Sequence, residues 1–210
     1  MISGKIIVLI TTLIVLLIIG YDISTNKTAR APSQEFAIKR DQGTWITYSS
    51  PNELFEVSLP TPPQHVSEAG LLVGASKDVK YDVFLSQGKD GSAFMISTII
   101  YPTPFAEDQK QSVLDNVVKE VLSTNTKNKL LHQELKTVLT FPALEFSIDN
   151  GEYLSKSMAI LAKEVLFVLT VMEKNPHHLD EDFQVFVNSL KIIRKNESVS
   201  SPQANSTQSR

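Results

Sequence analysis

The hydrophobic pattern divides this chain into a short membrane-like segment, a folded region and polar flanks. Residues 6–19 form an uninterrupted apolar run directly after Lys5. Residues 44–194 then alternate short apolar and polar stretches, which is typical of a domain with both strands and helices. Residues 22–43 and 195–210 are polar, so we expect a stalk and a disordered tail there.

The apolar run predicts that residues 1–21 are a membrane anchor or signal segment. The run covers about 21 Å as a helix at ~1.5 Å per residue, less than the ~30 Å of a bilayer core. The flanking residues are compatible with a membrane environment and extend the segment to residues 2–21, with Tyr21 at the membrane–water interface. The nearest cleavage-like pattern, residues 29–31, lies about ten residues beyond the run. We therefore expect contact with the membrane through residues 2–21 and an uncleaved single-pass anchor. The domain is expected on the extracytoplasmic (periplasmic) side, and secretion after cleavage is the alternative.

Alternation and turn signals predict antiparallel strands in the folded region. Residues 54–59 alternate apolar and polar side chains, as in a half-buried strand. Asn150 and Gly151 form a strong hairpin signal. Residues 165–172 are apolar on both faces, so this strand is expected at the centre of its sheet. The expected strands are residues 45–49, 54–59, 81–85, 94–101, 144–148, 153–161 and 165–172.

Two segments have the spacing of amphipathic helices. Thr103 and Pro104 provide a cap and a first helical position for one of them. Asp180 is expected to cap the second, with acidic residues in its first turn. Their apolar stripes are Val113, Leu114, Val117, Val118, Val121 and Leu122 in the first helix, and Phe183, Phe186, Val187 and Leu190 in the second. Hairpins with segregated helices predict an α+β fold.

The long connection of residues 60–79 has two interpretations. Its interior, residues 71–75, has the aliphatic content of a short strand, which is the expectation we prefer. The alternative is a functional loop, because long loops in compact domains often carry binding residues.

Composition excludes several classes of function. The chain has no cysteine, so disulfides, zinc–thiolate sites and thiol nucleophiles are impossible. The net charge of −3 gives no electrostatic support for nucleic-acid binding. An exported domain without disulfides must depend on its core, which favours a bacterial cell envelope.

Histidines and acidic residues near residue 180 form a candidate metal site. His177 and His178 precede the acidic residues 180–182, and imidazole and carboxylate are both metal ligands. Adjacent residues point in different directions, however, and the carboxylates fit a helix cap, so a solvated loop is predicted. His65 and His132 are isolated in the sequence. We predict no catalytic, cofactor-binding or metal-binding residue and no cofactor. The carboxylates are expected on solvent-exposed strand faces, in turns or at the start of a helix.

Three segments resemble the PsbP-like superfamily. Residues 48–62 resemble its opening turn, strand and proline-containing loop, and residues 186–192 are similar to its closing helix-to-strand segment. Residues 142–146 match an expected strand entry. The resemblance covers residues 44–194 and implies an antiparallel sheet sandwiched by helices, the fold of the photosystem II extrinsic subunit, of a Ran-binding nuclear-import factor and of bacterial envelope proteins.

The resemblance also implies a class of function. Members of the superfamily mostly bind or stabilise other proteins, and no family-wide active residues exist to transfer. We therefore expect a membrane-tethered, non-catalytic envelope domain that binds or stabilises a protein partner or complex. The alternative is a small-ligand or metal carrier that uses the concave face of the sheet.

Overall fold

The computed structural model describes residues 45–67 and 79–193. The expected anchor, stalk and tail, and the strand expected at residues 71–75, lie outside these described residues. Within them, no helix is both long enough and apolar enough to cross a bilayer.

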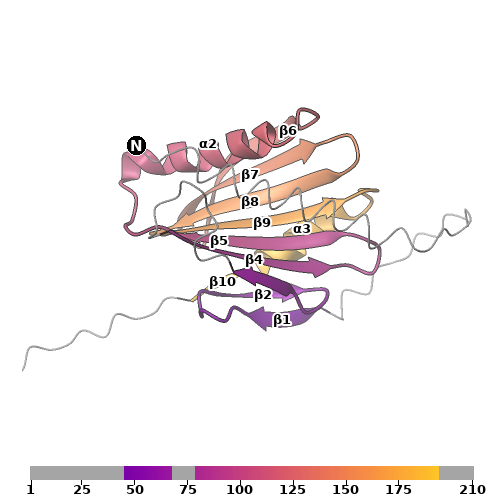
Figure 1. Cartoon of the computed structure of the whole chain (residues 1–210), viewed down its shortest axis with the longest axis horizontal. Coiled ribbons are helices and arrows are strands. Elements are labelled where there is room, and N and C mark those ends of the chain that lie inside the picture. The colour runs from indigo at the N-terminus through magenta and orange to yellow at the C-terminus, as the bar shows by residue number, and fades with distance from the viewer. Residues whose placement is uncertain (1–44, 68–78, 194–210) are drawn as a thin grey trace, which may run out of the picture.

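A seven-stranded antiparallel sheet forms the framework of the domain (Figure 1). Its order is β3-β4-β5-β9-β8-β7-β6, so β9 is the central strand, as its apolar sequence predicted. Hairpins connect β4 to β5, β6 to β7, β7 to β8 and β8 to β9. The strands are β3 (Gln64–Ser67), β4 (Lys80–Gln87), β5 (Ala93–Ile100), β6 (Lys129–Val138), β7 (Phe141–Asp149), β8 (Leu154–Ala162) and β9 (Val165–Glu173).

A second, three-stranded sheet brings the two ends of the described chain together. It consists of β1 (Ile46–Ser49), β2 (Phe55–Leu59) and β10 (Lys191–Ile192), with β2 in the middle. The burial of β2 alternates as predicted, because Phe55, Val57 and Leu59 are buried while the two residues between them are partly exposed. This sheet is additional to the single sheet that the sequence predicted.

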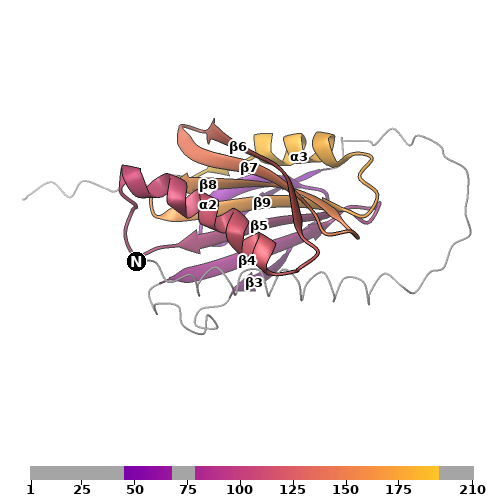
Figure 2. The same cartoon turned by 90° about the horizontal axis from the view of Figure 1, so that it is seen from above.

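The two helices lie on opposite faces of the large sheet (Figure 2). Helix α2 (Glu107–Ser123) packs on β7 and β8, and helix α3 (Leu179–Asn188) packs on β8, β9 and β2. An antiparallel sheet covered by helices is the α+β arrangement expected from the sequence.

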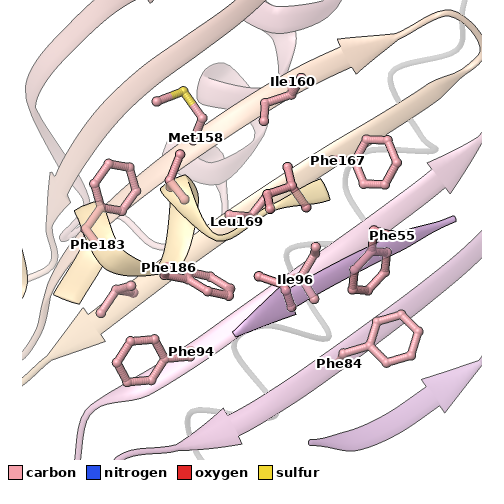
Figure 3. Close-up of a cluster of buried hydrophobic side chains, with 14 of the residues drawn as sticks. Phe55, Phe84, Phe94, Ile96, Met158, Ile160, Phe167, Leu169, Phe183 and Phe186 are labelled. Carbon is pink, nitrogen blue, oxygen red and sulfur yellow. The ribbon is translucent and has the colours of Figure 1, made fainter. Parts of the chain in front are cut away.

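Aromatic side chains fill the core between α3, the small sheet and the large sheet (Figure 3). The Phe186 ring lies edge-to-face with the Phe94 ring at 5.7 Å, and Phe55 packs likewise on Phe167 at 6.2 Å. Both geometries are favoured by the quadrupoles of the rings. The second core, on the other face, contains Val113, Leu114, Val117 and Val118 of the predicted α2 stripe, and the remaining two residues of that stripe, Val121 and Leu122, are partly buried against it.

Both helices begin elsewhere than predicted. Helix α2 starts at Glu107, with Ala106 at the cap position, so Thr103 and Pro104 lie in the preceding loop. Helix α3 starts at Leu179, with His178 at the cap position, so Asp180 is not its cap. At neither N-terminus does the side chain of the cap residue make a capping hydrogen bond. Tertiary packing of the apolar stripes therefore determines these helices more than their caps do.

Strands β3 and β6 were not predicted. The sequence of β6 is rich in lysine, leucine, glutamate and glutamine, which favour helices. It pairs with β7 because hairpin formation and the cross-strand neighbours outweigh this weak preference.

Truncation of Phe186 tests the core. Phe186 is fully buried, so Phe186→Ala should lower the free energy of unfolding by about 3–5 kcal/mol. Gln184 lies on the exposed side of the same helix, so Gln184→Ala should change it by less than about 0.5 kcal/mol. Urea denaturation measures both values, and equal midpoints for the two variants would contradict the assigned buried face of α3.

Candidate functional site

Strand β6 forms one edge of the large sheet and is exposed along most of its length. Among the described strands it pairs only with β7, and eight of its ten residues are exposed. Leu130, Leu131 and Leu135 expose 40%, 58% and 52% of their surface, and Leu139 in the following turn exposes 48%. A long edge strand with exposed apolar side chains is a template for pairing with another chain.

A two-residue turn directs β6 into β7. Leu139 and Thr140 both have positive φ, 51° and 74°, as a type I′ turn requires. The Asn-Gly pair that usually signals this turn is absent, which is why the sequence did not reveal this hairpin.

The turn determines which main-chain groups of β6 point outward. Val138 and Phe141 close the turn as a pair, and closing residues direct their N–H and C=O groups at each other. This direction alternates along an antiparallel strand. The N–H and C=O groups of Gln133, Leu135 and Thr137 therefore point away from β7.

A network of ion pairs ties β6 to the α3 face of the sheet. The Glu145 carboxylate on β7 is 4% exposed and pairs with Lys136 of β6 and, at 3.2 Å, with Lys156 of β8. Lys156 also donates to Asp180 of α3 at 2.7 Å. Burial raises the pKa of Glu145, but the hydrogen bonds and charges of the two lysines outweigh burial and hold the pKa below its ordinary value.

Two hollows flank the β6–β7 hairpin, one on each face of the sheet. The hollow beside α2 has a volume of about 380 Å³ and is lined by Leu114, Leu135 and Thr137, among others. The hollow beside α3 has a volume of about 340 Å³, with Met158 and Val187 among its lining residues. The same stretch of β6 therefore has a depression on each side, lined by both polar and apolar side chains.

Three carboxylates meet elsewhere in the domain. Oxygens of Asp90, Glu173 and Asp182 lie within 4.8 Å of one another, and Glu173 and Asp182 are buried. The β4–β5 loop, the end of β9 and the first turn of α3 supply them. Asp90 accepts hydrogen bonds from the N–H and hydroxyl of Ser92, and Glu173 accepts one from the His178 N–H. The sequence analysis placed these carboxylates in solvent, in turns or at the start of a helix. The prediction was wrong for Asp182, which is buried.

His65 is also not isolated, contrary to the prediction. Its Nε2 lies 2.9 Å from Asp82 Oδ1, and its ring is stacked on Phe84 at 4.3 Å. Asn52 donates to the other oxygen of Asp82 at 3.2 Å. Burial and, to a lesser degree, the Asp82 charge raise the pKa of Tyr48. This cluster joins β3 and the turn before β2 to β4, and it was missed because β3 was not predicted.

The other histidines lie near carboxylates of their own segments. His178 Nδ1 is 3.7 Å from Glu181, and His132 Nε2 is 3.7 Å from Glu134. His177 lies in the exposed loop before α3, as predicted. The acidic residues 180–182 fall in the first turn of α3, where the helix dipole favours them.

Comparisons with known proteins identify the fold. No protein-family model matches the chain, and no curated protein matches it significantly. The solution structure of cyanobacterial PsbP (CyanoP) from Synechocystis sp. PCC 6803 superposes with a TM-score of 0.52 at 14% identity, covering 79% of this chain and 98% of that one. A crystal structure from Bacteroides thetaiotaomicron VPI-5482 has a TM-score of 0.39 at 12% identity, and the match covers 72% of this chain and 50% of that chain. The described domain therefore has a PsbP-like fold.

Replacing Glu145 tests the ion-pair network. The pKa of this group lies below 4.5 in the folded state, so its stabilisation is present above that pH and is lost as pH falls through the folded pKa. Glu145→Gln should lower the free energy of unfolding by about 1–3 kcal/mol near pH 7. The difference from the parent should shrink at a second, lower pH at which the carboxylate is protonated in the folded state.

The matched control is Glu134→Gln, the same chemical change on an exposed side chain of β6. It should change the free energy of unfolding by less than about 0.5 kcal/mol. Urea denaturation at both pH values measures these effects. A Glu145→Gln deficit that is independent of pH would contradict the electrostatic role.

Proposed function

We propose that this chain is a non-catalytic, membrane-tethered domain on the extracytoplasmic side of a cell envelope. It binds another polypeptide by strand addition at the edge of β6. The observation that carries the proposal is the exposure of β6 along both of its faces. The tether rests on residues 2–21, whose apolar sequence favours a membrane segment.

The protections usually found on edge strands are weak in β6. Proteins commonly block such edges with lysines, prolines or bulges. Lys136 is held over the sheet by Glu145, so it does not guard the open side. The pairing irregularity lies near the start of the strand, between Leu130 and His132. Residues 132–138 therefore remain a regular and open edge.

The two hollows fit the way an added strand presents its side chains. Side chains alternate between the two faces of a strand, so a segment lying along β6 would direct successive residues towards α2 and towards α3. In known strand-addition complexes, main-chain hydrogen bonds provide affinity and pockets for alternate side chains provide specificity. The hollow beside α3 fits a side chain with an apolar stem and a polar end, because Met158 and Val187 line it together with Gln184 and Asn188.

The non-catalytic part rests on how the buried carboxylates are used. Glu145 holds two lysines, and Asp82 holds His65 and Asn52, so these groups join elements of the fold. The carrier alternative is favoured by the triad of Asp90, Glu173 and Asp182, which offers oxygen atoms of the kind divalent cations bind. Calcium takes about six to eight oxygen ligands, which is more than these three side chains supply. We therefore prefer strand addition at β6 to the carrier alternative.

A photo-crosslinking residue at position 135 tests strand addition. In the full chain, expressed in its own cells, it should give adducts with another polypeptide chain. The same residue at Lys119, which is exposed on α2, should not. Thr137→Pro should abolish the adducts, because proline removes an outward N–H group that an added strand needs.

Thr137→Ala is the matched control, since it keeps the N–H group and should keep the adducts. Denaturation midpoints check that both variants fold. Equal adduct yields from the proline and alanine variants would contradict strand addition, and equal yields from positions 135 and 119 would contradict the assigned edge.

A further inference from the structure

The regular part of β6 is complementary to itself. It runs from His132 to Val138, so Leu135 is its midpoint. We propose that a second copy of this chain occupies the edge, with the two β6 strands antiparallel about a two-fold axis at Leu135. The inference rests on the proposed strand addition at this edge and names its partner.

The main-chain groups fit this register. The outward-pointing residues are Gln133, Leu135 and Thr137, and they are symmetric about Leu135. Around the axis, Leu135 faces Leu135 of the second copy, and Gln133 faces Thr137 of the second copy. Every outward N–H and C=O of this stretch therefore meets an outward group, as hydrogen-bonded pairs of an antiparallel ladder require.

The charges select this register among its neighbours. A two-fold antiparallel pair must place one residue opposite its own copy. At Leu135 the register sets Glu134 opposite Lys136 of the second copy, and Lys136 opposite Glu134 of the second copy, which is favourable. A centre at Glu134 or at Lys136 would oppose identical charges. A centre at Gln133 would extend the pairing into the irregularity before His132.

The side chain at the axis is apolar and half exposed. Leu135 lies opposite Leu144, whose side chain belongs to the core beside α2, so Leu135 projects on that face. It exposes 52% of its surface in the single chain. The two copies of Leu135 would meet across the axis, so pairing removes apolar surface from water at its centre.

Single cysteines in the full chain test the register, since the chain has no cysteine of its own. Opposed residues of a hydrogen-bonded pair have Cα atoms about 5.5 Å apart, which a disulfide can span. In detergent micelles under mild oxidation, Leu135→Cys should therefore give a covalent dimer. Gln133→Cys alone should not, because its copies would lie about 13 Å apart. A mixture of Gln133→Cys and Thr137→Cys chains should crosslink to each other. Lys119→Cys is the control for random collision and for dimers held by other segments.

A charge reversal gives an independent readout. Glu134→Lys in the Leu135→Cys background should lower the dimer yield about tenfold, because it sets two lysines opposite each other at both ends of the pair. Glu181→Lys makes the same change on the exposed start of α3 and should leave the yield unchanged.

The outcomes separate this inference from the proposed function. No dimer from Leu135→Cys beyond the Lys119→Cys level, or equal yields from Gln133→Cys and Leu135→Cys, would overturn the self-pairing. Strand addition would still stand if the crosslinker at position 135 captured a different protein in a Thr137→Pro-sensitive manner. Failure of both experiments would remove the proposed function as well.

Discussion

The structure depends on covering both faces of the large antiparallel sheet. Its central strand β9 is almost entirely buried, so neither face can be left in water. One face is covered by α2, and the other by α3 together with the small sheet. This packing does not extend over β6, most of whose side chains are exposed to solvent. The exposure of the β6 side chains therefore follows from how far the two helices reach across the sheet, while the edge is open because no further described strand pairs with β6.

Sequence patterns predicted the parts of the fold that follow from local burial. The alternation in β2, the apolar run of β9 and the stripe of α3 each specify a buried surface, and the structure confirms them, except that Leu190 of the stripe is buried just beyond the end of α3. The Asn150-Gly151 turn was also predictable, because Gly151 has a φ of 85° that glycine adopts freely. Helix starts were less predictable, since packing rather than capping determines them here.

The candidate site was the least predictable part. Strand β6 consists of helix-favouring residues and ends in a turn of Leu139 and Thr140, so neither composition nor turn chemistry identifies it. The buried carboxylates were missed for a related reason. Glu145 meets lysines from two neighbouring strands, and Asp182 meets residues from a distant loop and strand. Such contacts depend on sheet order, which a single sequence does not specify.

The short strand β10 has a consequence for the order in which the molecule is made. It completes the small sheet beside β2, and Lys191 contacts Glu56 across 135 residues of chain. Ser189, at the end of α3, also accepts a hydrogen bond from the Ser58 N–H. A chain emerging from a ribosome or a translocation channel exposes β1 and β2 first, long before their last neighbours exist. The contacts of β2 with α3 and β10 therefore form only after these two elements have been made, and such distant pairing slows folding. The described domain is therefore completed by α3 and β10, and a chain that stops before α3 would leave the core without Phe183 and Phe186.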